Sequence, residues 1–270
     1  MNPAPGRLLR VADVSKRFFG LQAVAGVSLE ARPREITAVI GPNGAGKTTL
    51  FNCVTGLVRP DRCMSVLLSE DGKTATRLMG QTPEALCRLG IARTFQQVRL
   101  FESLSILDNI MIGLLVRHNL GWWAAIADRL AGGTRRHQAL RELAARQMRR
   151  VGLQGSGFEL AGNLDHGNRR RLEIARALAS EPAALLLDEP AAGMNHSETE
   201  ALMRLLQSLR QDGLTVLLIE HDMRLVMEVS DQIYVIDHGT VLASGKAAEI
   251  SSNPAVIDAY LGRAGHHVAA

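Results

Sequence analysis

The chain has 270 residues, of which 46% are hydrophobic and 21% charged, and its formal net charge is +4. A chain of this length and balance can bury a full core, which excludes a disordered protein, and the charge leaves nucleic acid or a membrane surface open as partners. The longest apolar runs, such as residues 216–219, are far shorter than the roughly 20 residues that a membrane-spanning helix needs.

Strands dominate the first part of the chain. Residues 8–18 and 24–31 predict two strands joined by a turn at Gly20, and the β-branched run at residues 36–40 predicts a short buried strand. Residues 58–77 mix turn residues with short apolar runs, which indicates an irregular hairpin region.

A phosphate-binding loop follows the predicted strand at residues 36–40. The spacing G-x-x-x-x-G-K-[ST] is met by Gly41, Pro42, Asn43, Gly44, Ala45, Gly46, Lys47, Thr48 and Thr49. A predicted helix over residues 48–55 completes the strand, loop and helix order of this motif. Its glycines let backbone N–H groups turn toward one point, while Lys47 reaches the β- and γ-phosphates and Thr48 ligates Mg²⁺. The alternative is a glycine-rich turn with an exposed lysine.

The second half of the chain is first helical and then alternates between strand and helix. Helix formers dominate residues 97–164, which predicts a separate helical lobe. Ser197 and Glu200 predict a capping box at the start of a later helix. The remaining predicted elements are helices at 137–151, 169–180, 197–211 and 253–261, strands at 184–187 and 214–219, and a hairpin from 232–236 and 241–243.

Two adjacent carboxylates, Asp188 and Glu189, follow the apolar strand at residues 184–187. Parallel strands deliver such residues to the carboxyl edge of the sheet, where the phosphate loop also opens. Asp188 therefore suits Mg²⁺ binding, and Glu189 suits orienting and deprotonating a water aimed at a γ-phosphate. As a surface pair these acids would carry no function.

At this point the chain resembles the nucleotide-binding subunits of ABC transporters, in which ATP and Mg²⁺ are the cofactors. The resemblance makes residues 41–49 the Walker A loop, Asp188 the Walker B aspartate and Glu189 the catalytic glutamate. It further implies that Gln96 touches Mg²⁺ and the attacking water, and that His221 contacts the γ-phosphate. Phe18 is similar to the aromatic residue that stacks on adenine; its neighbour Phe19 is the less favoured candidate.

Three segments, residues 93–101, 170–178 and 188–195, are similar to the ATPases of branched-chain and hydrophobic amino-acid importers, and residues 253–262 fit that branch too. Members of the branch also carry urea or amides, so the resemblance determines the family more closely than it determines the solute. The resemblance implies that two different ATP-binding subunits pair head to tail. It also implies two membrane permeases contacted beside Gln96, an indirectly acting solute-binding protein, and a place on the cytoplasmic face of the membrane.

The family's signature L-S-G-G-Q is replaced here by Leu164, Asp165, His166, Gly167 and Asn168. In the family this loop caps the nucleotide held by the other subunit, and an ionised carboxylate at the serine position cannot donate a hydrogen bond to a phosphate. Either Asp165 caps its own helix through the backbone N–H of Gly167 or Asn168, or the closed pair is weakened and turnover is slow.

The resemblance implies an α/β P-loop NTPase with an antiparallel β-lobe, a RecA-like core and an inserted helical lobe. Residues 1–96 and 165–246 are assigned to the β-lobe and core, 97–164 to the helical lobe, and 247–270 to a C-terminal helix and tail. The function implied is ATP hydrolysis that powers an importer. Two alternatives are a soluble ABC ATPase acting on nucleic acid or ribosomes, and a nucleotide sensor with weak turnover.

Overall fold

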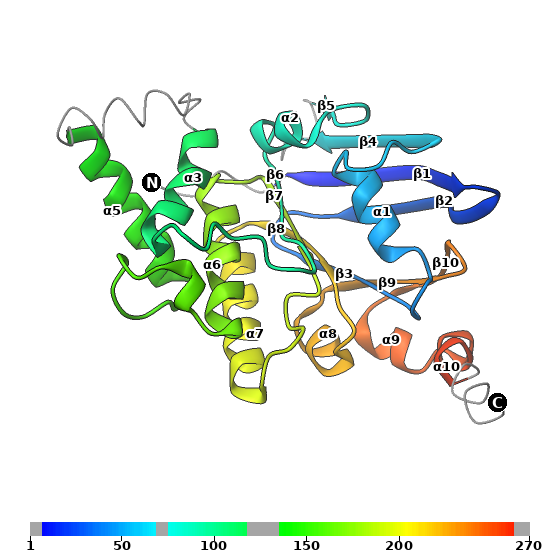
Figure 1. Cartoon of the computed structure of the whole chain (residues 1–270). Helices are drawn as coiled ribbons and strands as arrows, with labels where there is room; N and C mark the ends of the chain where they lie inside the picture. The colour runs from blue at the N-terminus through cyan, green and yellow to red at the C-terminus, as the bar shows by residue number, and fades with distance from the viewer. Residues whose placement is uncertain (1–6, 69–74, 118–134, 262–270) are drawn as a thin grey trace.

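Two β-sheets and a group of helices form the described part of the computed structural model, which covers residues 7–68, 75–117 and 135–261 (Figure 1). The smaller sheet is antiparallel, with strand order β2-β1-β4-β5. Its strands are β1 (Leu8–Phe18), β2 (Leu21–Ala31), β4 (Arg62–Leu68) and β5 (Ala75–Arg77). The two predicted N-terminal strands are confirmed, with the second beginning three residues earlier, and the irregular region becomes β4 and β5.

The larger sheet has the order β10-β9-β3-β8-β7-β6 and is parallel except for β10, which pairs antiparallel with β9. Its strands are β3 (Ile36–Ile40), β6 (Ile91–Arg93), β7 (Ala184–Asp188), β8 (Thr215–Ile219), β9 (Gln232–Asp237) and β10 (Thr240–Gly245). Every residue of β3, β7 and β8 is buried, which explains their continuous apolar runs, because both faces of a parallel sheet are covered.

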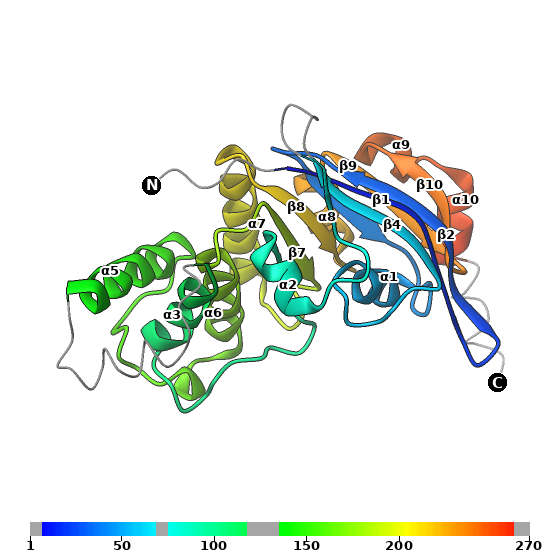
Figure 2. The same ribbon diagram turned by 90° about the horizontal axis from the view of Figure 1, so that it is seen from above.

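Side chains of alternate residues in these strands pack into different hydrophobic cores, because successive side chains of a strand point to opposite faces of the sheet. Leu186 and Leu217 join the core that α1 (Lys47–Val54) shares with the antiparallel sheet. Leu185 and Leu218 point the other way, into the core built with the helices on the left of Figure 1. A third core lies beneath α8 (Met223–Val229), α9 (Ala247–Ser251) and α10 (Pro254–Leu261), which cover β9 on the face away from α1 (Figure 2).

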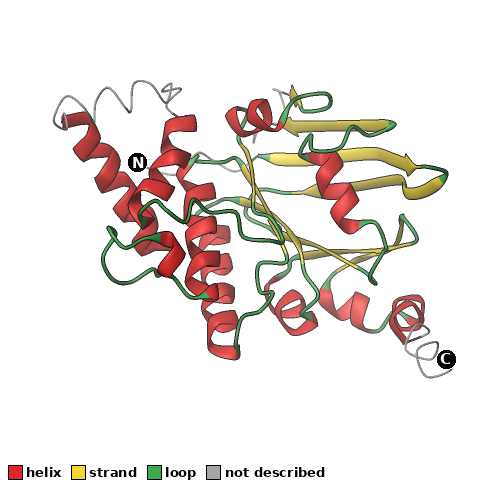
Figure 3. Ribbon diagram, in the orientation of Figure 1, coloured by secondary structure: helices red, strands yellow, loops and turns green. Residues whose placement is uncertain are grey.

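The remaining described helices gather at one end of the larger sheet (Figure 3). They are α2 (Pro83–Arg88), α3 (Ile106–Arg117), α5 (Arg135–Arg150), α6 (His166–Ala179) and α7 (His196–Gln211), with a short 3₁₀ turn at Ala161–Asn163. Helix α6, which the predicted boundary at residue 165 assigns to the core half, packs against α3 and α5. Residues 118–134 of the predicted helical lobe and the tail from 262 lie outside the described residues.

The predicted start of α7 was wrong. Its capping box is formed by Asn195 and Glu198, and the helix begins at His196. Ser197 instead donates its hydroxyl hydrogen to Asn195 Oδ1 at 2.7 Å. Two overlapping patterns, N-x-x-E and S-x-x-E, compete here, and the earlier one provides the cap because asparagine is at least as good an N-cap as serine. Among the described helices, none combines the length and apolarity required to span a bilayer.

Candidate functional site

Four neighbouring parallel strands end at the same edge of the larger sheet, and each is followed by one of the predicted site segments. The phosphate loop follows β3, His221 follows β8, Glu189 follows β7, and Gln96 follows β6. The carboxyl ends of parallel strands are the usual place for a ligand in such a sheet. The topology therefore brings together residues that are up to 180 positions apart in the sequence.

Two glycines of the phosphate loop are required by close backbone contacts. A Cβ atom on Gly41 would lie 2.0 Å from Ile236 O, and one on Gly46 would lie 2.3 Å from Ala23 O. Both residues also have positive φ angles, 150° and 103°. Gly46 is the N-cap of α1 and provides no side-chain acceptor, so the first amides of the helix point into the loop without a cap. Such an arrangement is suited to an anion.

Lys47 is buried within the loop that it serves. Its Nζ donates to Gly41 O at 2.7 Å and to Pro42 O at 2.9 Å, and only 5% of the residue is exposed. The ammonium group is thereby held against the backbone at the start of the loop. The expected contact of Lys47 with the outer phosphates of a nucleotide stays a prediction.

Gln96, Glu189 and His221 meet through their side chains. Gln96 Nε2 donates to Glu189 Oε2 at 2.9 Å, and His221 Nε2 lies 2.6 Å from Glu189 Oε1. The backbone of Glu189 has a φ of 48°, in the left-handed region that non-glycine residues seldom adopt, and its N–H donates to Ile219 O at 2.9 Å. The glutamate is thus held at both its backbone and its carboxylate.

Asp188 lies below this group and is 1% exposed. Its Oδ2 forms an ion pair with Arg93 at 2.7 Å, whereas Oδ1 is buried and has no hydrogen-bond partner among the described residues. Arg93 also donates to Asn52 Oδ1 at 2.7 Å and to Thr55 Oγ1 at 2.8 Å. Burial lowers the pKa of Arg93, and the Asp188 carboxylate opposes this effect. Sequence reasoning missed Arg93, because its partners Asn52, Thr55 and Asp188 come from distant segments of the chain.

A cleft of about 570 Å³ joins the phosphate loop to the Gln96, Glu189 and His221 group. Phe18 lines this cleft, whereas Phe19 does not and is fully exposed. The other lining residues are Leu21, Gln22, Ala23, Asn43, Gly44, Ala45, Gly46, Lys47, Thr48, Thr49, His238 and Gly239. The cleft has the size of a small-molecule site, and its lining combines an aromatic ring with polar groups.

Comparison with known proteins decides the family. The family described as ABC transporter matches residues 24–192, and the family described as branched-chain amino acid ATP-binding cassette transporter matches residues 240–266. The chain belongs to the ABC transporter family. It is therefore an ATP-binding cassette and an ATPase, which confirms the predicted family, activity and fold class.

Individual relatives of high similarity are also transport cassettes. The high-affinity branched-chain amino acid transport ATP-binding protein LivG of Salmonella typhimurium is 45% identical over 95% of this chain and 98% of its own length. The corresponding BraF of Pseudomonas aeruginosa is 43% identical with the same coverage. A solved nucleotide-free ATP-binding cassette from an ABC transporter has a TM-score of 0.79 and 27% identity, covering 94% of this chain and 98% of that one.

The signature segment of the cassette, residues 164–168, begins α6 away from the cleft. None of its residues lines the cleft that holds the phosphate loop. Asp165 is the N-cap of α6, where Oδ1 accepts from Asn168 N at 2.8 Å and Oδ2 from Asn168 Nδ2 at 2.9 Å. This geometry is the capping alternative that the sequence left open.

Sequence reasoning also missed Glu220, a carboxylate of the cassette that is 3% exposed. Its oxygens accept backbone hydrogen bonds from Ala191 at 2.7 Å, from His221 at 2.9 Å and from Asp222 at 3.3 Å. Burial raises the pKa of Glu220, and these hydrogen bonds act in the opposite direction. The side chain ties the loop after β7 to the loop after β8, and thereby holds His221 near Glu189.

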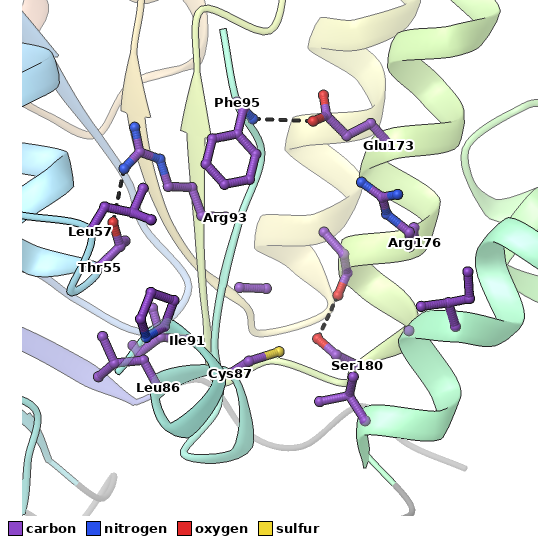
Figure 4. A pocket seen from close by; sticks show the side chains of 16 residues that line it. Thr55, Leu57, Leu86, Cys87, Ile91, Arg93, Phe95, Glu173, Arg176 and Ser180 are labelled. Atoms are coloured by element: carbon purple, nitrogen blue, oxygen red, sulfur yellow. Dashed lines mark hydrogen bonds between the residues drawn. The ribbon is translucent and has the colours of Figure 1, made fainter. Parts of the chain in front are cut away.

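A second, largely apolar groove of about 230 Å³ is lined in part by Phe95, the residue before Gln96 (Figure 4). It lies between α2, α3, α6 and β6, and Leu86, Cys87 and Ile91 form part of its wall. The charged side chains of the groove include Glu173 and Arg176, both from α6. Burial lowers the pKa of Arg176, and Glu173 opposes the shift. The groove is thus a largely apolar surface that also contains charged residues from α6 and β6.

Proposed function

We propose that this cassette hydrolyses ATP to power an importer of branched-chain or related amino acids. The hydrolytic part of the proposal is supported by one observation: Gln96 and His221 both contact the carboxylate of Glu189 at the edge of the cleft lined by the phosphate loop. The solute class is supported by the 45% identity with LivG over nearly the whole chain. Urea or amides are the alternative solutes.

In the proposed mechanism, Phe18 stacks on adenine, and the amides of residues 41–49 together with Lys47 bind the phosphates. Glu189 acts as the general base, accepting a proton from the attacking water. Gln96 orients that water from one side of the carboxylate, and His221 contacts the γ-phosphate from the other. Glu189 and His221 follow strands inside the sheet, and both Gln96 and His221 contact Glu189, so we propose that the site is organised before the nucleotide binds.

The residues around Asp188 fit a magnesium ion. The buried Oδ1 of Asp188 lacks a hydrogen-bond partner among the described residues and is an oxygen donor of the kind that Mg²⁺ prefers. Thr48 and Gln96 would complete the protein's contribution, and both line the cleft. When bound, the ion would neutralise charge on the β- and γ-phosphates.

A second ATP-binding subunit is part of the proposal because residues 164–168 do not line the cleft of their own chain. Paired head to tail, each subunit would present this segment, at the N-terminus of α6, to the nucleotide of the other. A heterodimer is proposed for the working importer. Closure of the pair on ATP and its loosening after hydrolysis would be the mechanical event.

The groove of Figure 4 is the proposed docking place for a membrane permease segment. It adjoins Phe95, which directly precedes Gln96, so a segment bound there would sense movement of the hydrolytic site. Two permeases, a place at the cytoplasmic face of the membrane and an indirectly acting solute-binding protein follow from this proposal. The nucleic-acid alternative is not favoured, because LivG and BraF, which are 43–45% identical to this chain, are transport proteins.

The weak-turnover alternative rests on Asp165 alone. Because Asp165 is engaged as the cap of its own helix, we propose that its carboxylate does not oppose the partner's nucleotide. Asp165→Ser should then leave the ATPase rate of the assembled subunits unchanged. A marked rise in rate would instead favour the alternative in which Asp165 weakens the closed pair of subunits.

The test of the proposed function has two parts. First, MgATP hydrolysis by the full chain should be lost in Glu189→Gln while ATP binding remains, whereas Glu181→Gln, a matched change outside the cleft, should hydrolyse like the wild type. Second, the chain should co-purify with membrane permeases, and uptake of labelled leucine into cells should depend on it. Hydrolysis without co-purifying permeases, or co-purification with RNA, would contradict the transport assignment but leave the ATPase intact.

A further inference from the structure

One arginine of α6, Arg170, is completely buried, with 0% of its surface exposed. Its Nη1 donates to Phe95 O and to Glu173 Oε2, the latter at 2.9 Å. Its Nη2 donates to Gln96 O and to Glu189 O, both at 2.9 Å. The two terminal nitrogens of a guanidinium carry four N–H groups, so every one of them has an acceptor.

The two acceptors of Nη2 are backbone carbonyls of Gln96 and Glu189, the residues whose side chains are hydrogen-bonded to each other in the proposed hydrolytic site. Gln96 and Glu189 contact each other through their side chains at 2.9 Å, and their backbone carbonyls are joined by the same arginine nitrogen. The backbone of Glu189 is in the left-handed region, which persists only where surrounding contacts hold it. Arg170 provides such a contact at the carbonyl, opposite the one that Ile219 O provides at the N–H.

Glu173 completes the attachment of this segment to α6. Its Oε1 accepts from Phe95 N at 3.2 Å, while its Oε2 pairs with Arg170, and the side chain of Glu173 is 2% exposed (Figure 4 shows the contact with Phe95). Phe95 is therefore held at both its N–H and its carbonyl by two side chains one helical turn apart. The backbone leading to Gln96 is fastened to α6 rather than to the sheet alone.

We propose that Arg170 is a positioning residue for ATP hydrolysis, which holds the backbones of Gln96 and Glu189 in register against α6. Arg170 lies two residues beyond the signature segment at residues 164–168, whose last three residues belong to the same helix. A shift of α6 as it meets the partner's nucleotide would therefore move the hydrolytic pair of its own subunit. This inference rests on the proposed roles of Gln96 and Glu189.

The test compares Arg170→Lys with wild type in MgATP hydrolysis by the full chain. Lysine keeps the charge and the buried stem but has one nitrogen with three N–H groups, so it cannot span four acceptors as the guanidinium does. We expect kcat to fall on the order of 10- to 100-fold, as for a small misplacement of reacting groups. KM for ATP should stay within about twofold, because Arg170 does not touch the phosphate loop. The control is Arg171→Lys on the same helix, since the side-chain hydrogen bond of Arg171 among the described residues goes to Gly152 O, at 3.4 Å, and not to the hydrolytic segments.

A double-mutant cycle separates positioning from simple loss of stability. If Arg170 acts through the hydrolytic pair, Arg170→Lys should reduce kcat by less than about threefold once Gln96→Ala is present, because coupled residues are not additive. Equal reductions in both backgrounds, together with a lower melting temperature, would show a structural role and overturn the inference. So would a kcat for Arg170→Lys equal to that of Arg171→Lys. In either case Glu189→Gln still reports separately on the proposed function.

Discussion

The buried ion pair between Arg93 and Asp188 should be far more important for stability than a surface pair of the same length. Its side chains are 7% and 1% exposed, and the distance between Arg93 Nη2 and Asp188 Oδ2 is 2.7 Å. Arg93→Met would leave Asp188 ionised and unpaired in the interior, which costs about 3–5 kcal/mol. For a domain of this size each kcal/mol lowers the melting temperature by about 2–4 °C, so a fall of about 6–20 °C is expected.

The matched control is Arg10→Met. Arg10 Nε also lies 2.7 Å from a carboxylate oxygen, Glu30 Oε1, but the two side chains are 50% and 33% exposed. An exposed pair contributes less than about 1 kcal/mol. Thermal unfolding followed by circular dichroism measures both variants. If the two melt at the same temperature, burial is not what makes the Arg93 pair important. Asp188→Asn added to Arg93→Met should recover part of the loss, since it removes the unpaired charge.

Three further predictions concern other parts of the site. Gly46→Ala should abolish ATP binding, measured by equilibrium dialysis, because its Cβ would lie 2.3 Å from Ala23 O. The control is Gly213→Ala, where φ is 95° but the space around the residue is open; it should still bind ATP and lose only about 1–2 kcal/mol of stability. Asp165→Ala should destabilise the chain by about 1 kcal/mol in urea unfolding through loss of the α6 cap, whereas Asp165→Ser should retain most of that stability, and equal effects of the two would contradict capping. Burial raises the pKa of Glu220 above its ordinary value of 4.5, so the folded protein binds the carboxyl proton more tightly than the unfolded chain does. The stability that this group contributes is therefore complete below pH 4.5 and is lost as the pH rises through the raised pKa. Glutamine does not ionise, so Glu220→Gln should remove that loss. The unfolding free energy of the variant minus that of the wild type should therefore increase as the pH rises above 4.5. A difference that does not change with pH would refute the raised pKa.

The parts of the fold with continuous apolar runs could be predicted from the sequence. Strand β3 and the strands before Asp188 and His221 were found almost to the residue, because burial on both faces leaves few polar positions inside them. The three-residue strand β6 was not predicted. A strand this short has no measurable period, and it forms because β7 offers it a partner along the chain's path to Gln96.

The candidate site shows the same division. Residues of a fixed chemical type in a local pattern, such as Lys47 and Glu189, could be named as candidates from the sequence, and their roles stay predictions. Arg93, Arg170 and Glu220 were not identified, because each acts through contacts with segments distant in the sequence, and no local pattern records those contacts. The error at α7 has a different cause: both Asn195 and Ser197 are followed three residues later by glutamate, so local chemistry allowed two starts.

The position of β6 at the margin of the larger sheet has a mechanical consequence. Glu189 and His221 follow strands that are hydrogen-bonded on both sides, whereas Gln96 follows a strand that has a single neighbour among the described strands. A force applied at the groove therefore meets least resistance at Gln96. Of the three side chains proposed to surround the γ-phosphate, the glutamine would be displaced most, and Glu189 would follow through the Arg170 side chain that binds both backbone carbonyls.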